Sequence, residues 1–289
     1  MNAIFQYLVL HDFIDEERDP IGGIPRSEVY KQITAESTKS FRWYADQVGA
    51  DHIFTDTWWF DKPHLDALDD MDNHRLVRSQ AFFEILRVIY DTQFDKYEKV
   101  LIADIDVIAN TTENIFDESD YDFYGVFESD MQDHKKRYMY NPWDLNTASG
   151  KEQYSMMERF HQKYDYPIHH VLPPNNPSKF MNMNTGLFVM TKKARLIARE
   201  YFSDWKQWVK NNLHEKTPLW FYVDQFFICA EIMKHDIEYE GISDKWNLPI
   251  THYGNDKMAL DKGNFLHYSG AEGRTKMFKH LNAGEFIWS

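Results

Sequence analysis

Val100-Leu101-Ile102-Ala103-Asp104-Ile105-Asp106-Val107-Ile108 is the stretch that decides how this chain folds. Four apolar residues lead into two carboxylates spaced two residues apart, and further apolar residues follow. A short, continuous apolar run is typical of a strand buried on both faces of a parallel sheet. Because Asp is unfavourable in strands and costly to bury alone, Asp104 and Asp106 need partners that offset their negative charge at the end of this strand.

Two kinds of partner would compensate these carboxylates. A divalent cation such as Mg²⁺ or Mn²⁺ takes carboxylate oxygens and shares its other positions with substrate phosphates. Nearby Lys or Arg side chains at an ordinary exit from a strand would also neutralise them. In open α/β sheets, ligands bind outside the carboxyl ends of the strands, which is where we expect Asp104 and Asp106 to lie.

The hydrophobic pattern around this stretch predicts alternating strands and helices. Upstream we expect strands at residues 4–10 and 51–55 and helices at 27–48 and 74–92. This order with short links implies right-handed crossovers and a mostly parallel sheet. Downstream we expect strands at 121–127 and 187–190, helices at 150–163, 192–209 and 222–233, and inward-facing Leu196, Ile197, Phe202 and Trp205.

Composition indicates a globular chain, since 43% of its 289 residues are hydrophobic. The net charge of -14 argues against nucleic acid or an anionic membrane surface as the main partner. The single cysteine, Cys229, lies in an apolar segment and is expected to be a packed core thiol. We find neither a stretch long enough to span a membrane nor a leader peptide, so we expect a cytoplasmic protein.

Two later motifs pair polar groups with apolar segments. Asn184-Thr185-Gly186 opens an apolar run, where Gly186 permits a close backbone approach and Asn184 offers a donor and an acceptor to a hydroxylated ligand. Asp224-Gln225 begins a helical segment. Each also has an ordinary interpretation, as a turn before a strand and as an acid that favours the helix macrodipole.

The third motif is Phe265-Leu266-His267, an apolar run that ends in His before the loop Ser269–Lys276, which is rich in glycine and basic residues. A neutral imidazole can bind a metal, and Arg274 and Lys276 can meet phosphate oxygens. A lone His is more often structural, but its position before such a loop favours a ligand role.

In this order, the motifs resemble the nucleotide-sugar glycosyltransferases of the type A fold, specifically the glycogenin-like family eight and its bacterial lipopolysaccharide galactosyltransferase relatives. The resemblance runs from the first strand to about Phe278. It implies one α/β domain with a Rossmann-like, mostly parallel sheet flanked by helices, comprising a nucleotide-binding half (1–120) and an acceptor and donor-sugar half (121–289). It also implies hexosyl transfer, with retention, from a nucleotide-sugar donor (UDP-sugar favoured) to a glycan, lipid or protein hydroxyl.

The resemblance assigns roles to matching positions. Metal ligands for Mn²⁺ or Mg²⁺ are Asp104, Asp106 and His267, and the positions that contact the donor sugar are Asn184, Gly186, Asp224 and Gln225. The glycine of the closing motif is matched by Gly270, but the family's diphosphate-binding lysine falls at Gly273, so either Arg274 or Lys276 takes its place. Arg78, or else Arg87, matches a basic residue that touches the donor sugar, and Asp12 falls where relatives bind the nucleotide base.

Two other functions remain open at this stage. A phosphatase of the haloacid dehalogenase type would use Asp104 as its nucleophile, although that motif normally opens its domain. A catalytically silent nucleotide-sugar or carbohydrate-binding module would hold a ligand in the same pocket. For the transferase, we expect the acceptor to bind along residues 131–177, where Trp143 and several tyrosines offer faces that pack on sugars.

Overall fold

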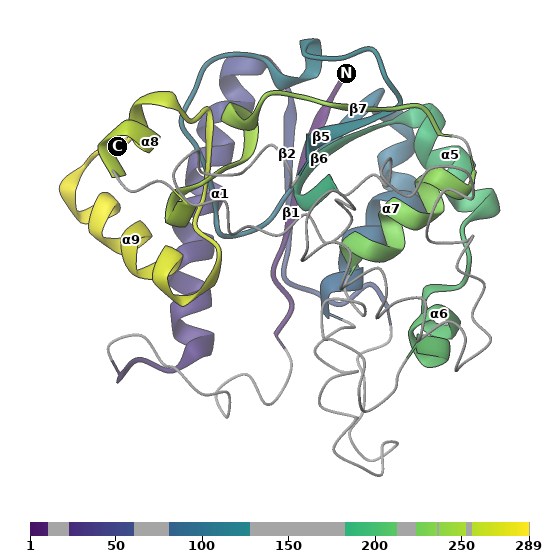
Figure 1. The fold of residues 1–289 in the computed structure, drawn as a ribbon, viewed down its shortest axis with the longest axis horizontal. Coiled ribbons are helices and arrows are strands. Elements are labelled where there is room, and N and C mark those ends of the chain that lie inside the picture. Colours follow the sequence, from purple (N-terminus) through teal and green to yellow (C-terminus); the bar gives the residue numbers. More distant parts are fainter. Residues whose placement is uncertain are drawn as a thin grey trace, which may run out of the picture.

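A six-stranded sheet with helices on both faces forms the centre of the computed structural model (Figure 1). The structure describes residues 1–10, 23–60, 81–127, 183–212, 224–235, 237–252 and 256–288. Strand order is β2-β1-β3-β6-β5-β7. The strands are β1 (Ala3–Tyr7), β2 (Asp51–Thr55), β3 (Lys99–Ala103), β5 (Phe123–Phe127), β6 (Met183–Thr191) and β7 (Tyr239–Gly241).

The predicted α/β class and mostly parallel sheet are confirmed. Strands β2, β1 and β3 are mutually parallel, as are β5 and β7. Only β6 is reversed among these six strands, because it pairs antiparallel with both β3 and β5. Strand β6 therefore joins the two parallel groups and lies directly beside the acid-bearing strand.

Strand β3 is apolar throughout because both of its faces are covered. Val100 and Ile102 pack into one hydrophobic cluster, whereas Leu101 and Ala103 pack into another on the opposite face. Successive side chains of a strand point to opposite faces, so a strand covered on both sides needs a continuous apolar run.

Two groups of helices provide this cover (Figure 1). Helix α1 packs Phe41 and Tyr44 into the cluster on one face, and α8 and α9 stand on the same side. The other face is covered by α3, α5 and α7, with α6 contributing Trp205. The helices are α1 (Arg26–Val48), α3 (Arg87–Tyr90), α5 (Lys192–Tyr201), α6 (Trp205–Asn212), α7 (Asp224–Lys234), α8 (Asp256–Lys262) and α9 (Gly270–Ala283).

A second, three-stranded sheet follows the acidic motif. It consists of β4 (Val107–Ala109), β9 (Phe265–His267) and β8 (Leu248–Pro249), in the order β4-β9-β8. Strands β4 and β9 are antiparallel, with Val107 opposite His267. This register places a histidine from near the end of the chain next to the residues that follow β3.

Several element predictions were wrong in detail. The helix predicted to end at residue 92 is, from residue 81 on, a series of short helical pieces: η4 (Phe83–Leu86), α3 and then η5 (Thr92–Lys96). The helix predicted at 192–209 is interrupted between α5 and α6, where Phe202 takes an extended conformation. Leu196, predicted to face inward, is 45% exposed because the buried face of α5 is formed by Ala194, Arg195 and Ala198.

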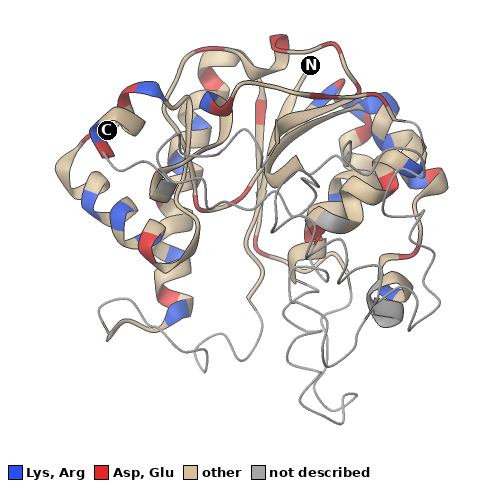
Figure 2. Ribbon diagram, viewed as in Figure 1, with Lys and Arg blue, Asp and Glu red and all other residues tan. Residues whose placement is uncertain are grey.

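The prediction that Cys229 is a packed core thiol is confirmed. Cys229 is a free, buried thiol on α7. The described helices include none with the length and apolarity needed to cross a bilayer. Charges of both signs lie mainly on helices and loops, and the strands of the central sheet carry few (Figure 2).

Candidate functional site

The acidic motif lies immediately beyond the carboxyl end of β3. The strand ends at Ala103, so Asp104 and Asp106 lie in the turn between β3 and β4, at the carboxyl end of the strand where the sequence predicted them. The Asp104 N–H donates to the Gly186 carbonyl at 2.8 Å, and the Val107 N–H donates to the Asp104 carbonyl at 3.2 Å. The turn forms here because the central sheet ends and β4 turns to pair with β9.

Two buried polar side chains hold this turn from the neighbouring elements. Gln6 of β1 donates through Nε2 to the Ser37 hydroxyl at 2.9 Å and to the Asp104 carbonyl at 3.4 Å. Ser37 of α1 donates in turn to the Val107 carbonyl at 2.6 Å. The backbone on both sides of the two carboxylates is therefore fixed by side chains that have no exposure to solvent.

His267, at the end of β9, joins the two acids. Its Nε2 lies 3.3 Å from Asp106 Oδ1, and its Nδ1 lies 2.9 Å from the side-chain oxygen of Asn247. One possible ligand atom from each of Asp104, Asp106 and His267 lies within 4.8 Å of the others. The structure thus brings together the three residues that the sequence assigned to a metal.

The electrostatics of the two acids are unequal. Burial, followed by the charges of Asp106 and Asp224, raises the pKa of Asp104 well above its ordinary value. Burial also acts to raise the pKa of Asp106, but the charge and hydrogen bond of His267 and the charge of Arg274 outweigh it and lower that pKa. Two carboxylates this close repel each other when both are ionised, which favours a proton or a cation at the site.

The donor set fits a divalent cation. The three ligand atoms lie within 4.8 Å of one another, whereas two oxygens bound to one Mg²⁺ at ~2.1 Å lie at most about 4.2 Å apart, so the side chains need to move only slightly to bind one ion. Two carboxylates and one imidazole suit Mn²⁺ or Mg²⁺ with remaining positions left for a ligand.

Gly186 is packed so closely against this cluster that a side chain does not fit. A Cβ at this position would lie 2.6 Å from His267 Cε1, 2.8 Å from Asn184 Oδ1 and 3.3 Å from Asp104 Oδ2. The sequence placed Asn184 and Gly186 in a turn before a strand, but both lie within the longer strand β6. The predicted close backbone approach at Gly186 is confirmed.

Asp224 and Gln225 begin α7 beside β6. Burial raises the pKa of Asp224 to about 6, although hydrogen bonds from the Thr185 side chain and from backbone N–H groups oppose this shift. The side-chain oxygen of Gln225 accepts the Thr185 N–H at 3.3 Å. The charge of Asp224 also contributes to the raised pKa of Asp104, so Asp224 lies close enough to act electrostatically on the cluster.

The start of α9 supplies positive charge. Within the described residues, the first turn of α9 receives no hydrogen bond from its N-cap side chain, Ser269. Arg274 is 8% exposed, and its Nε finds no hydrogen-bond partner in the part of the chain that the structure describes. Its guanidinium stacks over Tyr30 at 5.4 Å, and its charge lowers the pKa of Asp106.

The structure also separates the two basic residues between which the sequence could not choose. Lys276 forms ion pairs with Asp256 at 3.0 Å and with Glu272 at 3.6 Å. Gly273 must be glycine, because a Cβ there would lie 2.3 Å from the backbone of Tyr268. A basic side chain therefore cannot stand at residue 273, and the one that acts on Asp106 comes one residue later, from Arg274.

Some predicted site residues do not join this cluster or lie outside the described residues. Asp12, Arg78 and the segment 131–177 lie outside the described residues. Arg87, the alternative to Arg78, is paired with Asp91 and with the Thr55 hydroxyl, both at 3.0 Å. Gly270 begins α9 with a φ of 73°, which explains the glycine at that position.

Sequence reasoning missed Asn247, Gln6 and Tyr7. Asn247 is fully buried, and its only sequence signal is a polar residue inside the apolar run Trp246-Asn247-Leu248. Tyr7, at the end of β1, has its pKa raised by burial and by the charges of Asp104 and Asp224. Its hydroxyl donates to the Phe82 carbonyl at 3.0 Å.

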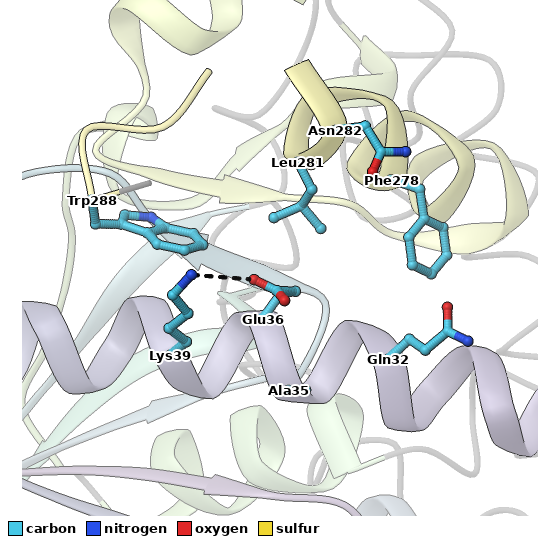
Figure 3. A pocket seen from close by; sticks show the side chains of 8 residues that line it. All are labelled: Gln32, Ala35, Glu36, Lys39, Phe278, Leu281, Asn282 and Trp288. Carbon is cyan, nitrogen blue, oxygen red and sulfur yellow. Dashed lines mark ion pairs between the residues drawn. The ribbon is translucent and has the colours of Figure 1, made fainter. Parts of the chain in front are cut away.

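A separate pocket of about 440 Å³ lies between α1 and the second half of α9 (Figure 3). Lys39 Nζ stands 4.9 Å above the Trp288 ring and 4.0 Å from Glu36. None of the residues that line this pocket belongs to the cluster around Asp104, so the pocket is not part of that site.

Comparisons with known proteins found similarity only among solved structures. No protein-family profile matches the sequence. No protein of curated function matches it either. The chain is similar to a glycosyltransferase involved in glycosylation of the major capsid of PBCV-1, with 12% identity over 98% of both chains and a TM-score of 0.49.

Two further solved structures are similar over most of their length. Galactosyltransferase LgtC, in complex with donor and acceptor sugar analogues, is 14% identical over 99% of this chain and 96% of its own, with a TM-score of 0.41. Mouse xyloside xylosyltransferase 1 is 11% identical over 92% and 97%, with a TM-score of 0.40. All three of these proteins are glycosyltransferases by their descriptions.

Proposed function

We propose that this chain is a metal-dependent glycosyltransferase that moves a sugar, with retention, from a nucleotide-diphosphate sugar to an acceptor hydroxyl. The observation that carries the proposal is the convergence of Asp104, Asp106 and His267 beside Arg274 and the start of α9. Two acids and an imidazole suit a divalent cation, and the helix start and the guanidinium suit the anion that such a cation binds. A pyrophosphate linkage requires both. Uridine donors are favoured by the family resemblance.

The site must first stabilise the negative charge that develops on the leaving group. The nucleoside diphosphate gains negative charge as the bond from the sugar to oxygen breaks, and a divalent cation, held by Asp104, Asp106 and His267, would neutralise part of that charge. Arg274 adds a buried positive charge, and the first N–H groups of α9 present the positive end of the helix dipole. Buried donors of this kind need little reorganisation during the reaction.

The opposite side of the site faces the sugar. Asp224 is buried with a pKa of about 6, so it is ionised at neutral pH and can stabilise the positive charge of an oxocarbenium-like sugar. Asn184 Oδ1 accepts hydrogen bonds from the Gly186 N–H and from the Asn247 NH₂. The amide NH₂ of Asn184 is therefore the group that would donate a hydrogen bond to a sugar hydroxyl. Gln225 supports this strand by accepting the Thr185 N–H.

The remaining assignments belong to the same proposal. Asp12 would contact the nucleotide base, Arg78 the donor sugar, and residues 131–177 the acceptor. The chain would then act as a single domain, in which residues 1–120 bind mainly the nucleotide and residues 121–289 bind mainly the donor sugar and the acceptor. Mn²⁺ is the preferred ion, since it accepts the imidazole of His267 as well as the two carboxylates.

A panel of nucleotide sugars tests this function. Purified protein with Mn²⁺ is expected to hydrolyse one member slowly without an acceptor, and Asp104→Asn and Asp106→Asn are each expected to abolish that turnover without unfolding the protein. Asp122→Asn is a matched control, because Asp122 is also buried but pairs with Lys193 at 2.6 Å, outside the cluster. Phosphate release from simple phosphomonoesters would support the phosphatase instead, and donor binding without turnover would support a binding module. Full activity of either Asn variant in the acidic motif would refute the proposal.

A further inference from the structure

Asn247 connects the metal-binding cluster to the strand that carries Asn184. It ends the short helix η10 (Asp244–Asn247), and its side chain has no exposure to solvent. Its oxygen lies 2.9 Å from His267 Nδ1, and its NH₂ lies 2.9 Å from Asn184 Oδ1. Neither His267 nor Asn184 is a sequence neighbour, so this contact exists only in the folded chain.

The direction of every hydrogen bond in this network follows from one backbone group. The Gly186 N–H can only donate, and it points at the Asn184 side chain at 3.0 Å, so the atom that receives it is oxygen. The Asn247 atom that meets the same oxygen must then be its NH₂. The other Asn247 atom is therefore oxygen, and the His267 Nδ1 that faces it must carry a hydrogen.

We propose that Asn247 is a positioning residue that fixes His267 with its hydrogen on Nδ1, so that Nε2 presents a lone pair to the cation shared with Asp104 and Asp106. The proposal rests on the metal role of His267 in the function proposed above. Nε2 stands 3.3 Å from a carboxylate oxygen of Asp106, close enough to donate a hydrogen bond to it. A cation held between the two atoms would take the place of that hydrogen, and Nε2 would then offer its lone pair to the cation. Histidines that bind metals commonly donate their other N–H to an oxygen in this way.

The same network ties the metal cluster to the sugar side of the site. Asn184 Oδ1 accepts hydrogen bonds from both the Gly186 N–H and the Asn247 NH₂. A movement of Asn184 would therefore remove a hydrogen-bond partner of Asn247, the residue that orients His267. Loss of such a supporting partner typically weakens metal binding by about 10- to 100-fold. We therefore expect Asn247 to affect metal affinity without itself touching the metal.

Three variants separate this role from a merely structural one. Asn247→Ala removes the acceptor for Nδ1–H and is expected to weaken Mn²⁺ binding, measured by calorimetry, about 10- to 100-fold. Asn247→Asp keeps an oxygen acceptor and is expected to bind Mn²⁺ more tightly than Asn247→Ala. Asn264→Ala is the matched control, because Asn264 is buried but donates to Glu113 at 3.2 Å, and its Mn²⁺ affinity is expected to match the wild type.

Imidazole nitrogen NMR reads the hydrogen position directly. With diamagnetic Cd²⁺ in place of Mn²⁺, the His267 signal, assigned by its loss in His267→Gln, is expected to show a hydrogen on Nδ1 in the wild type and a changed environment in Asn247→Ala. A hydrogen on Nε2 in the wild type would overturn the proposal, as would equal Mn²⁺ affinity of Asn247→Ala and the wild type. Absence of nucleotide-sugar turnover would contradict the proposed function alone, because neither the calorimetry nor the NMR depends on turnover.

Discussion

Replacing Gly186 with alanine tests whether the close packing around His267 sets the geometry of the site. A Cβ at residue 186 would lie 2.6 Å from His267 Cε1, whereas carbon atoms in contact prefer about 3.5 Å. Either the imidazole or β6 must therefore shift by about 0.9 Å. Neither can shift freely, because His267 is tied to Asn247 and Gly186 is hydrogen-bonded to Asp104 through its carbonyl.

The size of that shift predicts the size of the effect. A displacement of about 1 Å at a reacting site can reduce turnover about 100-fold, so we expect kcat/KM of Gly186→Ala to fall by about that factor. Inserting a methyl group into a tightly packed region destabilises a protein by about 1–3 kcal/mol, which a thermal melt would detect. The Mn²⁺ concentration needed for half-maximal activity is expected to rise as well, since the atom nearest to the new Cβ is Cε1 of His267.

Gly241→Ala provides the control, since its Cβ would lie 2.3 Å from the ring of Phe127, outside the cluster. We expect Gly241→Ala to lower stability by a similar amount while leaving the Mn²⁺ titration unchanged. If Gly186→Ala retained both its kcat/KM and its Mn²⁺ titration, the reasoning from close packing would be wrong. Equal changes in both variants would mean that loss of stability, and not local geometry, explains the effect.

Four further predictions concern the charged groups. Arg274→Gln is expected to raise the KM for the donor about 10- to 100-fold, whereas Lys276→Gln is expected to change it less than about threefold, since Lys276 is paired with Asp256; donor titrations of both variants would decide this. His267→Ala is expected to raise the Mn²⁺ concentration for half-maximal activity, and an unchanged titration would count against its metal role. Because burial raises the pKa of Asp224 to about 6, kcat is expected to fall about tenfold per pH unit below pH 6. Because folding raises the pKa of Asp224, the protein loses stability as the pH rises from about 4, the pKa in the unfolded chain, to about 6. We therefore expect Asp224→Asn to lose turnover and yet, at pH 8, to be more stable than the wild type by on the order of 3 kcal/mol. Denaturant unfolding of that variant that showed no gain in stability at pH 8 would contradict this account.

The candidate site was predicted from local signals to different degrees. Asp104 and Asp106 stood out because carboxylates are unusual beside a buried strand, and His267 because an apolar run ended at it before a basic loop. The difference between Arg274 and Lys276 appears only in the coordinates, where Lys276 pairs with Asp256 and the packing at residue 273 admits no side chain. Leu196 was predicted to be buried from helical spacing alone, yet the face of α5 that packs on the sheet is the one with Ala194 and Ala198.

The amino-acid sequence by itself determined the α/β class and the buried strand that ends at the acids, and it marked Asp104, Asp106 and His267 as candidates that the family resemblance then grouped as metal ligands. These follow from short-range rules, because apolar periodicity and the chemistry of carboxylate and imidazole groups can be read along the chain. Only the tertiary structure decided that β6 runs antiparallel to its neighbours and that Asn247 is hydrogen-bonded to His267. Contacts between residues far apart in sequence depend on strand pairing and close packing, and neither is encoded in any single segment.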